Sequence, residues 1–184
     1  MALKTGSLKQ KIAKLIFKLS IPGILTIILL SQSSEASKSP LADPKVDKVI
    51  VVKSKRVMML LSNSSIVRSY KIALGKQPVG SKVRMGDHKT PEGSYKLVSR
   101  NPKSKYHLSI KVSYPNEADV KKAKKLGVSP GGSIMIHGLP TGLGELAEAH
   151  RYWDWTDGCI AVTDSEMDEI WQLVSDGTPI EINP

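Results

Sequence analysis

Residues 152–166 read YWDWTDGCIAVTDSE and contain Cys159, the only cysteine of the 184-residue chain. Gly158 precedes this cysteine, and a short β-type run, CIAV, begins with it. Thr163 and Glu166 then have the spacing of a helix capping box. The stretch therefore predicts a loop, a short strand and a helix start around one thiol. That thiol is a small buried hydrophobe, half of an intermolecular disulfide, or a nucleophile.

Short apolar or alternating runs, separated by turn residues, extend outward from this stretch over most of the chain. They predict strands at residues 48–54, 56–62, 65–74, 95–98, 106–114, 133–138 and 178–182. The first two runs read as a hairpin, and a long loop rich in Gly and Pro lies within residues 75–97. Helix signals occur at residues 116–127 and 163–177, which begin with capping residues, and in the short stretch ELAEAH that His150 closes. The expected fold is mainly β, a sandwich-like domain with a few short helices.

The first 36 residues differ from the rest of the chain. Five lysines precede the only acidic residue, and the apolar run LSIPGILTIILL occupies residues 19–30. Small residues at Ser34 and Ala36 follow, so the pattern predicts a secretory signal peptide cleaved after Ala36. An uncleaved anchor is the alternative, although the run is short for a membrane span. Residues 37–46 are expected to be a linker and residues 47–184 the folded domain, exported to the periplasm or cell envelope.

Charge and cysteine content limit the function classes. The chain carries a formal net charge of +10, which falls to +6 without the first 36 residues. A moderately basic exported domain suits an anionic envelope polymer or an acidic peptide as partner. No nucleic-acid motif is present, and membrane contact is expected only through the N-terminal segment. A single cysteine excludes a CxxC pair or a zinc cluster built on several cysteines.

A nucleophilic thiol needs a base, and His137 is the strongest candidate among four histidines. It ends the β-type run SIMIH and is followed by Gly138, a position suited to presenting a base to a cleft. The N–H groups of Gly158 and Cys159 could form an oxyanion hole, the donor pair that a tetrahedral acyl intermediate requires. Spacing alone leaves both a catalytic and a structural thiol open. The other histidines have simpler explanations as surface, packed or helix-terminal residues, namely His88, His107 and His150, although His88 in the Gly/Pro loop could also line a cleft.

These residues resemble the signature of the YkuD-type L,D-transpeptidases, bacterial enzymes that cross-link peptidoglycan. That signature is a His, a spacer, Ser or Thr, His, Gly and Cys. Here His137 is followed by 18 residues and then by TDGC, residues 156–159. The segments MGDHKTPEGSYKL, NPKSKYHLSIKVSYPN and GGSIMIHG are similar to further family segments. The resemblance covers most of residues 47–182.

The resemblance implies a cysteine acyl-transfer mechanism on peptidoglycan stem peptides. Cys159 would attack the carbonyl before the terminal D-Ala, and His137 would act as general base and then acid. Backbone N–H groups at Gly158 and Cys159 would hold the oxyanion, Thr156 would help orient the base, and Gly138 would lie close to the site. No metal or organic cofactor is expected. The acyl acceptor would be an amine of another stem or of an envelope protein.

Two departures from the signature leave the reaction open. Asp157 stands where the family has His, and Ala161 stands where the family often has Asn or Arg. A carboxylate beside the thiol would raise the thiol pKa unless it points away. The alternatives are therefore a hydrolase that uses the same Cys and His, or a non-catalytic envelope-binding module. Trp153 and Trp155 are expected either to pack the cleft wall or to stack on substrate.

Overall fold

The computed structural model describes residues 44–184. The predicted signal peptide at residues 1–36 and most of the predicted linker therefore lie outside the described residues. Val46, at the end of the predicted linker, is buried in the core. The N–H of Asp47 donates a hydrogen bond of 2.9 Å to the carbonyl of Leu61. The folded region thus includes at least one residue that the sequence assigns to the linker.

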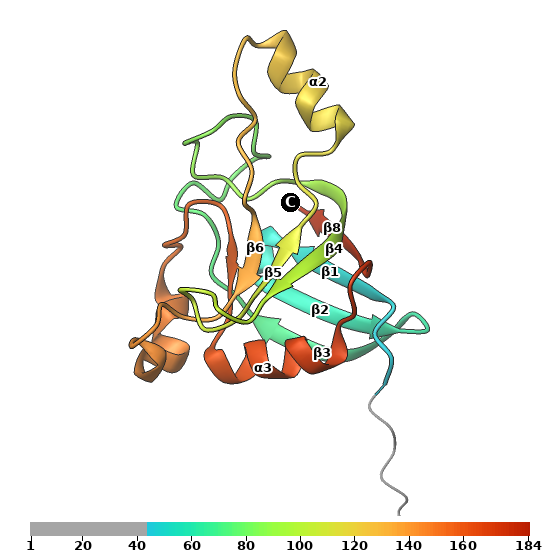
Figure 1. Cartoon of the computed structure of the whole chain (residues 1–184), viewed down its shortest axis with the longest axis vertical. Coiled ribbons are helices and arrows are strands. Elements are labelled where there is room, and N and C mark those ends of the chain that lie inside the picture. Colours follow the sequence, from blue (N-terminus) through green and yellow to red (C-terminus); the bar gives the residue numbers. More distant parts are fainter. Residues whose placement is uncertain (1–43) are drawn as a thin grey trace, which may run out of the picture. The chain divides into compact units, whose positions relative to one another are not determined.

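Eight strands form one curled sheet in the order β3-β2-β1-β8-β4-β5-β6-β7 (Figure 1). Their bounds are β1 Lys48–Val52, β2 Val57–Ser62, β3 Ser65–Lys71, β4 Gly93–Asn101, β5 Ser109–Val112, β6 Met135–His137, β7 Ile160–Ala161 and β8 Pro179–Asn183. The β1–β8 and β6–β7 pairs are parallel, and the other pairs are antiparallel. The predicted mainly β fold and the predicted β1–β2 hairpin are confirmed.

Strand β4 connects the two halves of the sheet. Its first residues, 93–96, pair with β8, whereas residues 97–101 pair with β5. A register shift between Leu97 and Ser99 marks the change of partner. Such irregularities bend a strand and let it pass from one packed layer to the next. The sandwich-like character of the domain depends on this bend.

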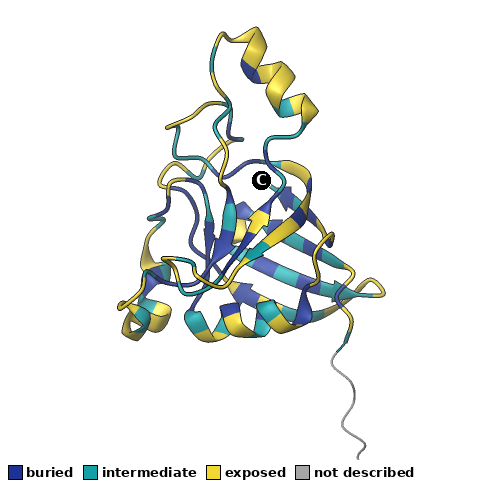
Figure 2. Cartoon of the chain, viewed as in Figure 1, coloured by how far each residue is buried: buried dark blue, intermediate teal, exposed yellow. Residues whose placement is uncertain are grey.

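Alternation of side chains along the strands builds the core. Strand β1 buries every second residue, and β2 and β8 show the same period of two over most of their length. Figure 2 shows these buried positions along the strands. Representative fully buried residues are Val49, Val51, Met58, Leu60, Ile136, Ile160, Ile180 and Ile182. The inward-facing residues of both halves thus form one hydrophobic cluster.

Helix α3 (Asp164–Leu173) follows β7 and begins at the predicted capping box. The Thr163 hydroxyl accepts from the Glu166 N–H, and the Glu166 carboxylate accepts from the Thr163 N–H. Its apolar face, which includes Met167 and Ile170, packs into the core. The helix ends four residues before its predicted end because Val174 is already extended.

Helix α2 (Glu117–Lys125) has the predicted Asn116 cap, completed by Asp119 in a capping box. Of its residues only Ala123 is buried, and Figure 2 shows the helix almost wholly exposed. Two 3₁₀ segments, η1 (Lys53–Lys55) and η2 (Gly144–Tyr152), complete the elements. No helix within residues 44–184 combines the length and apolar character that a membrane span needs.

Strand β5 is shorter than the 106–114 segment that alternation predicts. His107 lies at a φ of 60°, in the left-handed region, which interrupts extended backbone before Ser109. Residues 102–108 instead form turns, including a bond from the Lys103 N–H to the Asn101 side chain. The same alternation of polar and apolar residues is compatible with a strand and with turns, so the sequence pattern alone does not distinguish the two here.

The two ends of the sheet meet beside the TDGC stretch. Past the end of β3, Ala73 and Ala161 of β7 exchange backbone hydrogen bonds of 3.0 and 2.9 Å. The next residues continue this contact, since the Thr156 N–H donates to Leu74 and the Lys76 N–H donates to Thr156. Residues 73–76 are thereby fixed against the segment that precedes Cys159.

Candidate active site

Cys159 and His137 lie at the ends of two neighbouring parallel strands. Ile136 pairs with Ile160, and His137 pairs with Ala161. Both isoleucines are buried in the core. Because successive side chains of a strand point to opposite faces, His137 and Cys159 emerge together on the face away from those isoleucines. The topology therefore places on one face of this strand pair the two residues that the sequence proposes as base and nucleophile, with His137 beside Ala161, two residues after Cys159.

The His137 ring is held in one tautomer by its own backbone neighbour. The side chain is 3% exposed, and its Nδ1 lies 2.7 Å from the carbonyl oxygen of Gly138. A carbonyl only accepts, so Nδ1 carries the proton and Nε2 keeps its lone pair. Burial lowers the pKa of His137, against a smaller opposing effect of the Gly138 hydrogen bond. The ring is therefore neutral near pH 7 and can accept a proton at Nε2.

Two aromatic side chains pack against this ring. The Tyr106 ring centroid lies 4.5 Å from that of His137, and the Trp155 centroid lies 5.7 Å away in an edge-on arrangement. Trp155 also contacts His150 and stacks on Tyr106. For Trp155 the structure thus shows packing around the base. Trp153 remains half exposed.

The Cys159 thiol sits in surroundings that oppose its ionisation. Burial raises the pKa of the thiol, and the charge of Asp157 raises it further. A hydrogen bond from the Met135 backbone and the charge of Lys82 act in the other direction but are outweighed. The sulfur contacts the carbonyl oxygen of Ser133 at 3.5 Å. A thiol of this kind stays protonated at neutral pH and needs a base to become a nucleophile.

The hydroxyl of Thr156 holds the loop of the nucleophile. It donates to the Cys159 carbonyl at 2.8 Å and accepts from the Gly158 N–H at 3.1 Å. These bonds lie within the TDGC turn and do not involve His137. Thr156 therefore shapes the loop that carries Cys159, whereas the sequence predicted that it would help orient His137. The Gly158 N–H is engaged in this turn, which leaves the Cys159 N–H as the backbone donor next to the sulfur.

Gly158 is required by both its conformation and its surroundings. Its φ is 129°, which L side chains rarely adopt, and an added Cβ would lie 2.6 Å from the carbonyl oxygen of Lys89. Glycine therefore lets the backbone of Lys89 approach the residue before the nucleophile.

We expect Gly158→Ala to lower the free energy of unfolding by about 1–3 kcal/mol and to reduce activity by displacing Cys159. Gly142→Ala is the matched control, because Gly142 also has positive φ (88°) but would place its Cβ in open space. Denaturant unfolding and activity measurements on both variants check this. Equal behaviour of the two variants would show that the Lys89 contact is unimportant.

Gly138, directly after His137, allows a carboxylate of α3 to reach the end of β6. An added Cβ would lie 2.5 Å from Oδ1 of Asp164, and the same oxygen accepts a 2.7 Å hydrogen bond from the Leu139 N–H. Asp164 thus fixes the chain immediately after the base. In the sequence, Asp164 stands out only as one residue of the predicted 163–177 helix.

Asp157, at the departure from the family signature, is part of an ion-pair cluster. Its side chain is 74% exposed, and its Oδ1 lies 3.0 Å from Lys76 Nζ and 2.9 Å from His88 Nδ1. Hydrogen bonds from Lys76 and then from His88 lower the pKa of Asp157. From its place in the Gly/Pro loop, His88 is expected to be a surface or packed residue or to line a cleft, and nothing in the local sequence connects it with Asp157. The approach of His88 to Asp157 depends on the loop that carries His88.

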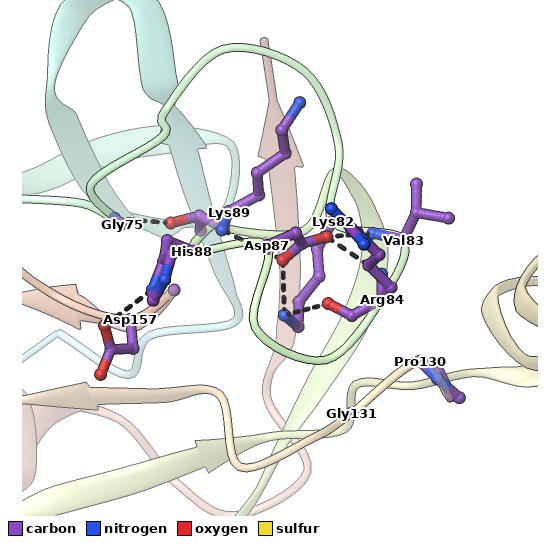
Figure 3. A network of polar contacts seen from close by, with 12 residues as sticks. Gly75, Lys82, Val83, Arg84, Asp87, His88, Lys89, Pro130, Gly131 and Asp157 are labelled. Atoms are coloured by element: carbon purple, nitrogen blue, oxygen red, sulfur yellow. Dashed lines mark hydrogen bonds and ion pairs between the residues drawn. The ribbon is translucent and has the colours of Figure 1, made fainter. Parts of the chain in front are cut away.

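That loop is held by a buried ion pair (Figure 3). Lys82 and Asp87 are 4% and 8% exposed, with Nζ and Oδ1 2.7 Å apart. The Asp87 carboxylate also accepts from the N–H groups of Val83, Arg84 and Lys89. Burial alone would raise the pKa of Asp87, but these hydrogen bonds outweigh it and hold the pKa at about 2.

We expect Asp87→Asn to destabilise the protein by at least about 2 kcal/mol near neutral pH, since one pKa unit corresponds to about 1.4 kcal/mol. The pKa of Asp87 is lowered by folding. The stabilisation is therefore fully present above the unfolded value of about 3.9 and is lost as pH falls through about 2. Urea unfolding at several pH values measures it.

Asp176→Asn serves as the control for this variant. Asp176 forms an exposed pair with Arg100 at 3.5 Å, and such pairs contribute about 0–1 kcal/mol. If Asp87→Asn were no more destabilising than Asp176→Asn, Asp87 would not hold the loop.

An apolar cavity of about 160 Å³ is lined by Trp153 and Trp155, by residues of the 139–146 segment and by His150. His150 is buried, and its Nε2 has no hydrogen-bond partner within the described residues. The sequence placed it at a helix end, where it does lie, in η2. Among residues 44–184, no group of His, Cys, Asp or Glu has an arrangement that could hold a metal ion.

Comparison with known proteins agrees with this geometry. Among curated proteins, YafK of Escherichia coli strain K12, provisionally named an L,D-transpeptidase, is 29% identical over 180 residues, covering 90% of this chain and 64% of YafK. Among solved structures, the helical cell shape determining protein Pgp2 of Campylobacter jejuni is 27% identical with a TM-score of 0.58, covering 76% of this chain and 48% of Pgp2. Bd1075 of Bdellovibrio bacteriovorus is 26% identical with a TM-score of 0.53, covering 75% and 48% of the respective chains.

The chain therefore spans about two thirds of the length of its curated relative and about half the length of these solved proteins. The model of the YkuD L,D-transpeptidase catalytic domain matches residues 47–182. This range contains every described strand except the last residue of β8. The chain belongs to the YkuD family of L,D-transpeptidase catalytic domains.

Proposed function

We propose that this protein is a peptidoglycan L,D-transpeptidase that uses Cys159 as nucleophile and His137 as general base and acid. The observation that carries the proposal is the placement of both side chains on one face of the β6–β7 pair, with the His137 tautomer fixed by Gly138. Membership of the family supports the reaction class.

In the proposed reaction, Nε2 of His137 accepts the thiol proton as the sulfur attacks the carbonyl before the terminal D-Ala of a stem tetrapeptide. The N–H of Cys159 donates to the resulting oxyanion. The tetrahedral intermediate collapses, His137 returns the proton to the leaving amine, and D-Ala departs from a thioacyl-enzyme. An amine then attacks the thioester with His137 again as base, forming the new amide and restoring the thiol.

The acyl acceptor is proposed to be a diamino-acid amine of another stem or an amine of an envelope protein. The basic character of the domain suits an anionic envelope polymer. We propose that residues 1–36 direct the protein to the periplasm or cell envelope, where this substrate lies. Attack by water in place of the amine gives the alternative reaction, hydrolysis of the stem by the same Cys159 and His137.

Product analysis distinguishes these reactions. The full-length chain is incubated with a disaccharide-tetrapeptide and the products are identified by mass spectrometry. A cross-linked dimer that has lost one Ala supports transfer, whereas a tripeptide without dimer supports hydrolysis. Unchanged substrate, with folding verified by circular dichroism, would contradict both enzymatic reactions and favour a binding module.

We expect kcat/KM to follow a broad bell-shaped pH profile. Burial lowers the pKa of His137, so the base is neutral down to pH values below the ordinary histidine value of about 6.5. Burial raises the pKa of Cys159, so the thiol keeps the proton that it passes to His137 at pH values above the ordinary cysteine pKa of about 8.5. The plateau of kcat/KM should extend from the lowered pKa of His137 to the raised pKa of Cys159. An acidic limb with its midpoint above pH 7 would contradict a neutral buried base.

A further inference from the structure

The loop at residues 81–89 borders a second cavity, of about 530 Å³, next to the TDGC stretch. Arg84, Asp87, His88 and Lys89 contribute to its lining, together with Leu126 from the end of α2. This cavity is separate from the apolar one beside Trp155, and its lining combines apolar surface with charged side chains.

The charge of this cavity is positive once the internal pairs are considered. The Asp87 carboxylate is occupied by Lys82 and by three backbone N–H groups. In contrast, the side chains of Arg84 and Lys89 form no ion pair or hydrogen bond within residues 44–184, and Arg84 is exposed. Two cationic residues of the cavity lining therefore lack an internal counter-ion.

The loop that presents these charges is braced on several sides. The Met85 N–H donates 2.8 Å to the carbonyl of Ser129, and the Gln77 N–H donates 3.0 Å to the carbonyl of His88. His88 itself has a φ of 54°, a left-handed conformation that is uncommon outside glycine. The backbone is therefore fixed, at some cost, in the conformation that directs His88 toward Asp157.

His88 joins the cavity to the nucleophile. Figure 3 shows its ring turned toward Asp157, away from the Lys82–Asp87 pair. Asp157 is two residues before Cys159, and the carbonyl of Lys89 lies against Gly158. A ligand that fills the cavity would thus lie along residues 87–89, which directly border the TDGC turn.

We propose that this cavity is a subsite for a free carboxylate of the peptide substrate, with Arg84 and Lys89 as its cationic partners and His88 at its border with the reacting centre. The inference rests on the proposed function, because it names a part of the same acyl donor. A guanidinium matches the planar carboxylate with two parallel hydrogen bonds, and such charge-assisted bonds are stronger than neutral ones.

The test combines changes in the ligand with changes in the protein. Steady-state kinetics of the full-length chain are measured with the disaccharide-tetrapeptide and with analogues in which one free carboxylate at a time is a carboxamide. The protein variants are Arg84→Met, which keeps the aliphatic length and removes the charge, and Lys96→Met as control. Lys96 is an exposed lysine of β4 away from the cavity lining.

For wild type, we expect one of the carboxamide analogues to have a KM raised by about tenfold or more with kcat little changed. Arg84→Met should raise the KM of the parent substrate similarly and no longer discriminate that analogue, while Lys96→Met behaves as wild type. The subsite would be overturned if wild type turned over the parent peptide and all carboxamide analogues with the same KM. It would also be overturned if Arg84→Met kept the wild-type difference in KM between them. Either result would leave the proposed function intact. Absence of turnover with every peptide would overturn the proposed function and the subsite with it.

Discussion

Cys159→Ala should abolish acyl transfer, with a loss of about four to six orders of magnitude in kcat, as for the removal of nucleophiles from other base and nucleophile units. The thiol is the only cysteine of the chain, so no neighbouring sulfur can replace it. Burial raises the pKa of the thiol, so the sulfur depends on a base to lose its proton. The raised pKa does not change where the sulfur lies in the site. Product formation from the disaccharide-tetrapeptide measures the loss.

Folding of this variant is the necessary control. The hydrogen-bond contacts of the sulfur are with backbone groups of Ser133 and Met135, and the position is half-buried. We expect the thermal midpoint of Cys159→Ala to stay close to that of wild type. A folded Cys159→Ala variant that retains more than a small fraction of activity would contradict the assignment of the nucleophile.

His137→Gln should reduce kcat by about 10³–10⁴-fold with a much smaller change in KM, in line with the contribution of general acid–base catalysis. Glutamine approximates the polar shape of the ring but cannot accept the thiol proton at neutral pH. This matters because the ring is buried and packs on Tyr106 and Trp155, so truncation to alanine would also leave a cavity. Steady-state kinetics measure the changes in kcat and in KM separately and show which of the two is larger.

His107→Gln is the matched control for the histidine. His107 is partly exposed and pairs with Asp168 at 2.7 Å, outside the β6–β7 pair. We expect its activity to remain within a few-fold of wild type. If His137→Gln and His107→Gln had similar small effects, His137 would be a packed core histidine.

The sequence could single out Cys159 and His137 as candidates for nucleophile and base because their signals are local. His137 ends an apolar run, Cys159 follows a glycine, and the 18-residue spacing between His137 and TDGC resembles a family signature. The capping box of Thr163 and Glu166 is likewise a short-range pattern, and the structure contains it. The mainly β fold followed from the number and spacing of short strands.

The surroundings of Asp157 could not be predicted in the same way. Lys76, His88 and Asp157 come from three segments, and their approach depends on the Ala73–Ala161 contact that joins the ends of the sheet. It also depends on the buried Lys82–Asp87 pair, which is formed within a loop without periodic pattern. Sequence reasoning treated Asp157 as an unfavourable neighbour of the thiol. In the structure its carboxylate is directed to Lys76 and His88, while its charge still raises the thiol pKa.

The central claim, a thioacyl-enzyme on Cys159, is tested most directly by trapping that intermediate. The full-length chain is mixed with the disaccharide-tetrapeptide without an acceptor amine, quenched in acid and examined by intact mass and peptide mapping. We predict a mass increase equal to the substrate minus D-Ala, located on the peptide that contains Cys159 and absent from Cys159→Ala. Release of D-Ala without a Cys159 adduct, or the same adduct on Cys159→Ala, would contradict it.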